Sequence, residues 1–350
     1  MGHPGEGGGR ITLDVMGGDH APAATIEGAL RAAAREDARR VAPERVLLVG
    51  DEAVVEAELA ARGGNPGFEI VHASQAIGMD ESPSKAMRAK PDSSIARCVA
   101  LVKEGAAGAF VSMGNTGAVV GASTLLLKTL PGVRRPAIAV TLNLTGHPIT
   151  ILDMGANIVP KPEHLYQYAV MGSVYVRDVL GIEEPRVALL NIGEEPSKGT
   201  DLLKDAHAML SSSDVRFVGN LEGGDIFHDR ADVLVTDGFT GNVVLKLLEN
   251  FATFMLKLTV GELQKEGVKF GPEALAGVLK NIDYSEYGGA LLLGVGGSVV
   301  IGHGRSDSRA VANALGLAAS TLDADVNADI VRGLERLQPP AVRGEESAAG

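Results

Sequence analysis

The sequence has few of the residues that mark several common protein classes. Among its 350 residues there is one cysteine, Cys98, and no tryptophan. A single cysteine forms neither an intramolecular disulfide nor a cysteine-rich zinc site, which indicates a reducing compartment. Because Cys98 lies within the apolar run IARCVALV, we expect a buried structural thiol there and no covalent nucleophile.

Long apolar runs and excess positive charge are also missing. No uninterrupted stretch reaches the ~18 apolar residues of a membrane span, and MGHPGEGGGR at the start lacks the apolar core of a signal peptide. The formal net charge of -12 disfavours nucleic acid as a partner. We therefore expect a cytoplasmic protein, at most peripherally attached to the inner face of the cell membrane, with flexible tails at 1–9 and 339–350.

Short apolar runs alternate with alanine- and leucine-rich stretches along most of the chain. Predicted strands lie at 10–15, 45–50, 68–73, 109–113, 137–142, 149–154, 186–192, 215–220, 232–237 and 290–295. Predicted helices lie at 24–40, 51–62, 93–105, 116–129, 162–180 and 200–212. Continuous apolar strands that alternate with helices are typical of a parallel sheet covered on both faces.

This pattern predicts an α/β protein with three α/β/α layers around a mostly parallel, Rossmann-like sheet. The adjacent runs 137–142 and 149–154 predict a hairpin. No composition break marks a linker, so we expect a single catalytic domain over 10–338 with a helical excursion near 241–280.

Glycine-containing polar loops follow several of the predicted strands. They lie at 14–22, 112–120, 153–162, 191–200 and 237–246. Ligands of open parallel sheets bind outside the carboxyl ends of the strands, so the last four loops predict a single shared cleft. The alternative is that glycine, asparagine and aspartate simply form turns there.

Known catalytic motifs do not account for these loops. The first loop reads MGGDHAP, with Pro22 at the expected helix start, and lacks the G-x-G-x-x-G dinucleotide fingerprint. A Walker P-loop, a G-x-S-x-G elbow and an H-E-x-x-H metal motif are also absent from the sequence. No covalent nucleophile therefore stands out.

The loops instead offer hydrogen-bond donors, one ammonium group and several acids. This set suits substrate positioning and oxyanion stabilisation. An anionic nucleophile such as inorganic phosphate fits, because it needs alignment more than deprotonation. The candidate residues are Asp14, Asp19, His20, Asn115, Thr116, Asp153, Asn157, Lys198, Asp237, Gly241 and Asn242.

Many collinear motifs carry a resemblance to one family. They are DVMGGDHAP (14–22), ESPSKAMRAKPDSSI (81–95), SMGNTGAV (112–119), DMGAN (153–157), NIGEEPSKG (191–199), GNLEGGDI (219–226), DVLVTDGFTGNVVLK (232–246) and YGGALLLGVGGSVVIGHGRS (287–306). On these motifs the chain from about 11 to 330 resembles the bacterial phosphate acyltransferases, the acyl-carrier-protein:phosphate acyltransferases of phospholipid synthesis.

The resemblance implies a reversible transfer of a long-chain acyl group from acyl carrier protein to inorganic phosphate. The acyl phosphate product would serve a membrane glycerol-3-phosphate acyltransferase. The resemblance also implies a homodimer, no metal or nucleotide cofactor, and the fold of phosphotransacetylases and isocitrate/isopropylmalate dehydrogenases.

Combined with the loop chemistry, the resemblance predicts a role for each catalytic residue. Lys198 supplies positive charge to the phosphate, which attacks the thioester directly. Asn115, Asn242 or nearby N–H groups stabilise the oxyanion. Asp237 orients Lys198 or the pantetheine arm, and His20 protonates the leaving thiolate.

Two surface features predict contacts with partners. The apolar helix 243–263 carries Phe251, Met255 and Leu258 at helical spacing, as in a core or dimer-interface helix or in a tip that touches the bilayer. Arg31, Arg35 and Arg39 recur every four residues of the predicted helix 24–40. They would form one basic face for the acidic carrier protein, or an ordinary solvated face.

Other functions stay open at this point. A phosphotransacetylase that uses acyl-coenzyme A is the first alternative, although no nucleotide fingerprint is present. A non-catalytic membrane scaffold for lipid enzymes is the second, on the basis of the apolar helix. A dehydrogenase rests on fold relatives alone, and fold does not determine function.

Overall fold

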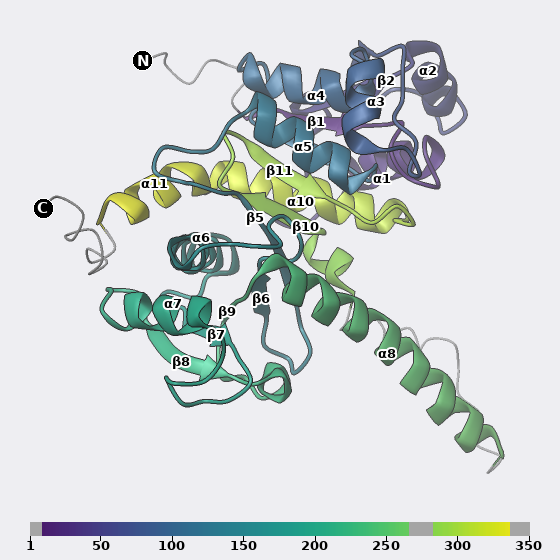
Figure 1. The fold of residues 1–350 in the computed structure, drawn as a ribbon. Coiled ribbons are helices and arrows are strands. Elements are labelled where there is room, and N and C mark those ends of the chain that lie inside the picture. Colours follow the sequence, from purple (N-terminus) through teal and green to yellow (C-terminus); the bar gives the residue numbers. More distant parts are fainter. Residues whose placement is uncertain (1–8, 266–282, 337–350) are drawn as a thin grey trace, which may run out of the picture.

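The computed structural model describes residues 9–265 and 283–336. One mixed sheet runs through these residues, and helices cover both of its faces (Figure 1). The strands are β1 (Ile11–Asp14), β2 (Val46–Gly50), β3 (Glu69–His72), β4 (Ala109–Ser112), β5 (Ala137–Leu142), β6 (Ile149–Leu152), β7 (Val187–Leu190), β8 (Phe217–Leu221), β9 (Val233–Val235), β10 (Ala290–Leu293) and β11 (Ser298–Ile301).

The helices pack on either side of this sheet. The α-helices are α1 (Ala23–Ala34), α2 (Glu52–Ala60), α3 (Pro83–Ala89), α4 (Ser94–Lys103), α5 (Thr116–Leu126), α6 (Pro162–Leu180), α7 (Asp201–Ser211), α8 (Gly238–Lys265), α10 (Ser308–Asp323) and α11 (Val326–Arg336). Short 3-10 turns are η1 (Pro43–Arg45), η2 (Gly223–Phe227) and η3 (Tyr284–Tyr287).

The sheet order is β3-β2-β1-β4-β11-β10-β5-β6-β9-β7-β8. Seven of the ten strand pairings are parallel. The three antiparallel pairings are β11–β10, β10–β5 and β5–β6. The predicted mostly parallel sheet is therefore confirmed, and so is the hairpin, since β5 and β6 pair antiparallel.

Alternate strand residues enter two separate cores. Val46 and Leu48 of β2 belong to one apolar cluster, whereas Leu47 and Val49 belong to the other. This alternation explains why the strands are apolar without interruption, because both faces of the sheet are covered. Cys98 lies in the second core and is fully buried. Burial raises the pKa of its thiol well above its usual value, as expected for a structural cysteine.

The direction of the strands differs from what the prediction of one shared cleft assumed. Strands β6, β7 and β9 run antiparallel to β1 and β4, because three successive antiparallel pairings separate the two groups. The carboxyl end of β4 therefore lies at the opposite edge of the sheet from those of β6, β7 and β9. Of the four loops, the loop 112–120 therefore follows a strand whose direction is opposite to that of the other three.

Helix α8 differs from the other helices because it extends away from the body of the protein (Figure 1). Only its first turns pack firmly, with Gly238, Gly241 and Leu245 buried. The predicted excursion 241–280 corresponds to this helix up to Lys265, and its remainder lies outside the described residues. The described residues also exclude residues 1–8 of the predicted flexible segment 1–9, the predicted segment 339–350 and residues 337–338 of the predicted domain.

Candidate active site

The buried side chain of Asp14 holds the first loop, 14–22, which follows β1. The Ser112 hydroxyl donates to Asp14 Oδ2 at 2.7 Å, and the Met16 N–H donates to Oδ1 at 3.2 Å. Burial raises the pKa of this carboxyl group above its usual value. A Cβ on Gly17 would collide with the carboxylate, so glycine lets the loop close over it. Asp14 thus anchors the loop from the interior.

Asn115 joins the β4 loop to a neighbouring segment. Its Oδ1 accepts the N–H of Ala118 at 3.1 Å and so caps α5. Its Nδ2 donates to the carbonyl oxygens of Met79 and Glu81, each at 3.0 Å. Because protein groups already occupy this amide, its geometry is that of a positioning residue. Thr116 follows it as the first residue of α5 and is exposed.

Asp153 organises the loop after β6. It is fully buried, and burial raises the pKa of its carboxyl group above its usual value. Its carboxylate accepts the backbone N–H groups of Ile138, Gly155, Ala156 and Asn157. The Asn157 side chain donates to the carbonyl oxygen of Pro136 at 2.6 Å, and its backbone carbonyl accepts the Gly238 N–H at 2.9 Å. The loop is therefore tied to the start of α8.

The first turn of α8 is capped by Asp237. Its Oδ1 accepts two backbone N–H groups of that turn at 3.0 and 2.9 Å. Gly241 is buried against the backbone of Asp153, whereas Asn242 is exposed on the same turn. Asp237 and Gly241 therefore position the helix, and Asn242 is the predicted residue here whose side chain reaches solvent.

Lys198 lies on a loop that is itself well fixed. The Asn191 side chain donates to the carbonyl oxygen of Lys198 at 3.2 Å, and the Asn220 side chain donates to that of Glu195 at 3.0 Å. The Lys198 side chain is exposed and makes no ion pair within the part of the chain that the structure describes. A fixed loop that presents an unpaired ammonium group is suited to bind an anion.

His20 and Asp19 are exposed at the tip of the first loop. The Asp19 N–H donates to the carbonyl oxygen of Gly304 at 2.7 Å, which ties this tip to the turn between β11 and α10. The structure thus gathers the predicted residues into two groups. One contains Asp14, Asp19, His20, Asn115 and Thr116, and the other contains Asp153, Asn157, Lys198, Asp237, Gly241 and Asn242.

The predicted basic helical face does not form. Helix α1 ends at Ala34, and Arg35 already has an extended backbone with φ -65° and ψ 149°. Arg31 pairs with Glu27 on the helix, whereas Arg35 pairs with Asp37 in the loop beyond it. Arg39 donates instead to the carbonyl oxygen of Glu286 at 3.1 Å. The continuous face was wrong because the helix ends before its second arginine.

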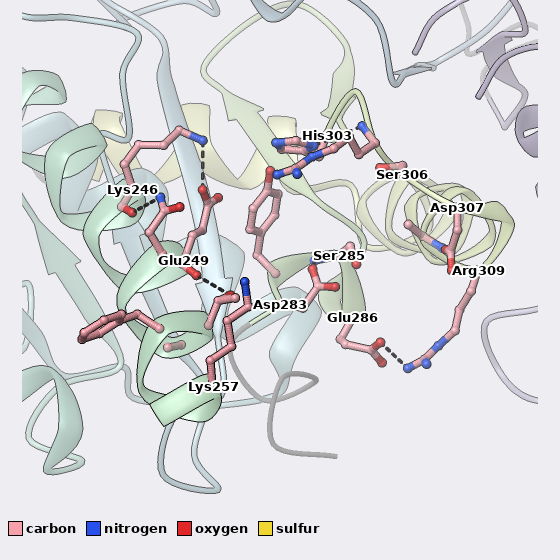
Figure 2. A pocket seen from close by; sticks show the side chains of 17 residues that line it. Lys246, Glu249, Lys257, Asp283, Ser285, Glu286, His303, Ser306, Asp307 and Arg309 are labelled. Carbon is pink, nitrogen blue, oxygen red and sulfur yellow. Dashed lines mark hydrogen bonds and ion pairs between the residues drawn. The ribbon is translucent and has the colours of Figure 1, made fainter. Parts of the chain in front are cut away.

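A cavity of about 870 Å³ lies between α8, η3 and the β11–α10 turn. Figure 2 shows side chains from these three elements facing one another across it. Its lining residues are Lys246, Glu249, Asn250, Ala252, Thr253, Phe254, Lys257, Asp283, Tyr284, Ser285, Glu286, His303, Arg305, Ser306, Asp307, Arg309 and Ala310. We call this space the α8–α10 cavity.

None of the candidate catalytic or substrate-binding residues named from the sequence lines the α8–α10 cavity, although the motif 287–306 contains His303, Arg305 and Ser306. Its β11–α10 turn, GHGRSD (302–307), nevertheless has the strand–polar loop–helix pattern used to select the other loops. The strand before this turn, β11, is hard to predict because glycines, which are depleted in strands, directly precede it. The tip of the first loop borders this turn through Asp19.

His303 has a defined hydrogen-bonding state in this cavity. Its Nδ1 accepts the N–H of Arg305 at 3.1 Å, so the proton of the neutral ring lies on Nε2. Burial lowers the pKa of His303 below its usual value, and the nearby charges of Lys246 and Arg305 lower it further. Glu249 and Asp19 oppose this effect. His303 is thus a neutral donor near pH 7.

The described residues contain no group of three or more His, Cys, Asp or Glu side chains that could hold a metal ion. Within the same residues, no helix is both long and apolar enough to cross a membrane.

Comparison with solved structures identifies the same architecture elsewhere. A phosphotransacetylase from Streptococcus pyogenes has a TM-score of 0.59 at 17% identity, covering 91% of this chain and 95% of its own. A branched-chain phosphotransacylase from Enterococcus faecalis V583 has a TM-score of 0.51 at 17% identity, covering 89% and 98%. At these identities the likeness shows the fold, which is the predicted one.

Comparison of sequences is more specific. The profile of the family described as "Fatty acid synthesis protein" matches residues 9–329. A "Phosphate acyltransferase" of Myxococcus xanthus is 46% identical over 93% of this chain and 94% of its own length. One of Heliobacterium modesticaldum is 47% identical over 88% and 92%. The chain therefore belongs to this fatty acid synthesis family, together with proteins named phosphate acyltransferase, and it is an acyltransferase.

Proposed function

We propose that the protein transfers a long-chain acyl group from acyl carrier protein to inorganic phosphate and forms acyl phosphate for phospholipid synthesis. The name phosphate acyltransferase, carried by relatives that match nearly the whole chain, is the observation on which this proposal mainly rests. An unpaired ammonium group on a fixed loop supports it, because both the acceptor and the phosphopantetheine arm of the donor carry phosphate.

The proposed reaction needs no covalent enzyme intermediate. An oxygen of hydrogen phosphate attacks the thioester carbonyl carbon, a carbon–oxygen bond forms and the carbon–sulfur bond breaks. The proton of hydrogen phosphate finishes on the released thiol, so charge and atoms balance. The fully buried Cys98 agrees with this scheme, since its thiol has no access to a substrate. Catalysis then consists of alignment and charge stabilisation.

Each predicted catalytic residue has a role in the proposed reaction that agrees with its hydrogen bonds and its exposure. Lys198 binds a phosphate group, and Asn242 donates to the oxyanion from the first turn of α8. Asp237 acts through that turn, which its carboxylate caps. His20 stays the predicted donor to the leaving sulfur, since its side chain is exposed at the tip of the first loop.

The donor can be identified by direct comparison. We expect palmitoyl-acyl carrier protein with phosphate to yield palmitoyl phosphate, and palmitoyl-coenzyme A to react at least 10-fold more slowly at equal concentration. Palmitoyl-coenzyme A is included as a comparison donor because phosphotransacetylases share the fold. Mass spectrometry of palmitoyl phosphate is the measurement. Faster use of palmitoyl-coenzyme A would replace the proposed donor.

We extend the proposal to the exposed apolar face of α8, which we expect to pair with a second copy in a homodimer near the body and to meet the bilayer farther out. Phe251, Met255 and Leu258 are 54%, 42% and 48% exposed, which excludes the core alternative for this helix in the single chain. Lys257 and Lys265 on the same helix would favour anionic lipid. Peripheral attachment would bring acyl phosphate to a membrane glycerol-3-phosphate acyltransferase.

A charge placed on this face is expected to weaken membrane binding. Leu258→Glu should lower cosedimentation with phosphatidylglycerol vesicles at least tenfold, because burying a carboxylate in lipid is costly. Leu125→Glu on α5 is the control, since Leu125 is also an exposed leucine. Failure of the unaltered protein to sediment, or an equal loss in both variants, would contradict this role of α8.

A further inference from the structure

The α8–α10 cavity contains charges that the fold does not neutralise. Lys246 pairs with Glu249 at 2.9 Å and Arg309 pairs with Glu286, as Figure 2 shows. In contrast, the Arg305 guanidinium has no carboxylate partner among residues 9–265 and 283–336. The same holds for the Lys257 ammonium group.

The other carboxylates of the cavity are already bound to backbone groups. Asp283 Oδ1 accepts the Ser285 N–H at 2.9 Å, and Asp307 Oδ1 accepts the Ala310 N–H at 2.9 Å. Each caps a helical turn, and neither forms an ion pair with Arg305 in the described residues. The Arg305 guanidinium therefore lines the cavity with its hydrogen-bond donors free of a carboxylate in the described residues.

Hydrogen-bond donors surround this charge. The Nε2–H of His303 is available, because Nδ1 accepts the Arg305 N–H. Ser306 is 8% exposed, and its hydroxyl has no partner in the described structure. It immediately precedes Asp307, whose carboxylate caps the 16-residue helix α10. A cation, a neutral imidazole donor and an unsatisfied hydroxyl thus lie on one short turn, 303–306, that lines the cavity.

We propose that the inner end of the α8–α10 cavity, where His303, Arg305 and Ser306 meet, binds a phosphate group of the acyl-transfer reaction. The group is either the inorganic phosphate or the phosphate of the phosphopantetheine arm, because the same donors recognise both. This inference rests on the proposed function for its reaction. Its binding step can be measured without turnover.

The test is calorimetry on the full chain with two probes, inorganic phosphate and pantetheine 4′-phosphate. Arg305→Gln should weaken binding of one probe about 10-fold to 100-fold, as loss of a charged hydrogen bond does. Arg305→Lys should keep part of the affinity. Arg332→Gln, an exposed arginine paired with Asp329 on α11, is the matched control and should change neither affinity.

Kinetics on the same variants separates the two sources. A higher KM for inorganic phosphate with little change in kcat assigns the site to the nucleophile, and a higher KM for the acyl donor assigns it to the arm. Equal affinities of unaltered protein and Arg305→Gln for both probes would overturn the inference. If the unaltered protein binds a probe but forms no acyl phosphate, the proposed function fails while the phosphate site stands.

Discussion

Replacement of Gly241 by alanine is expected to destabilise the protein by about 3 kcal/mol, near the upper end of overpacking effects. A Cβ at this position would collide with the carbonyl oxygen of Asp153 and lie 3.0 Å from Thr236 Cγ2. Neither neighbour can retreat, because Asp153 is buried in its own hydrogen bonds and Thr236 is 1% exposed. The start of α8 would have to move away from the β6 loop.

The measurement is thermal or denaturant unfolding of the variant beside a control on the same helix. Gly261→Ala meets no atom within 4 Å and should be neutral or slightly stabilising, since alanine favours helix more than glycine. We also expect Gly241→Ala to lose most acyl-transfer activity. An unchanged unfolding midpoint would contradict the close contact at the start of α8.

Replacement of Lys198 by alanine is expected to lower kcat/KM for phosphate about 100-fold, which corresponds to about 2.7 kcal/mol of transition-state stabilisation. The side chain is exposed and unpaired within the described residues, so its removal should leave the unfolding midpoint unchanged. The loop should persist, because Asn191 and Asn220 hold its backbone and not its ammonium group.

Lys204→Ala is the matched control for Lys198. Lys204 is also solvent-exposed, lies six residues farther along the chain and pairs with Asp201 at 3.4 Å. Its removal should leave the kinetics unchanged. Full activity of a folded Lys198→Ala variant would remove Lys198 from the mechanism and leave Arg305 as the leading candidate for the phosphate.

Much of the fold could be predicted because local signals in the sequence are strong. The continuous apolar runs of β2, β5 and β7 reflect burial on both faces, and the hairpin follows from the short gap between β5 and β6. The direction of the strands is harder to predict, because it depends on which strands pair in the folded sheet. Strand β10 lies antiparallel between β11 and β5, so β5 keeps the direction of β11, and the β5–β6 pairing reverses the strands beyond it. No local pattern predicts the pairing of β10 with β5, because these two strands are distant in the chain.

Less of the candidate site than of the fold could be predicted from the sequence. Asn115, Asp153 and Asp237 were selected for their polar side chains, but these side chains bind backbone groups and position loops. Whether a polar side chain binds a backbone group or faces a substrate cannot be predicted from its residue type. The α8–α10 cavity was missed because it depends on a glycine-rich strand and on the path of α8.

Of the alternative functions that the sequence leaves open, one is now excluded and one remains to be tested. The family relationship excludes the non-catalytic scaffold, because its members are acyltransferases. The phosphotransacetylase alternative remains testable through the donor. Arg31, Arg35 and Arg39 no longer form one docking face, so the surface that receives the carrier protein has to be sought elsewhere.

The most direct test of the account is phosphate-dependent release of thiol from palmitoyl-acyl carrier protein. We predict that thiol and palmitoyl phosphate appear in equal amounts when phosphate is present. Without phosphate, no thiol should be released, not even one equivalent per enzyme, because phosphate itself attacks the thioester. Thiol release without phosphate, or release that yields free palmitate, would contradict direct acyl transfer to phosphate.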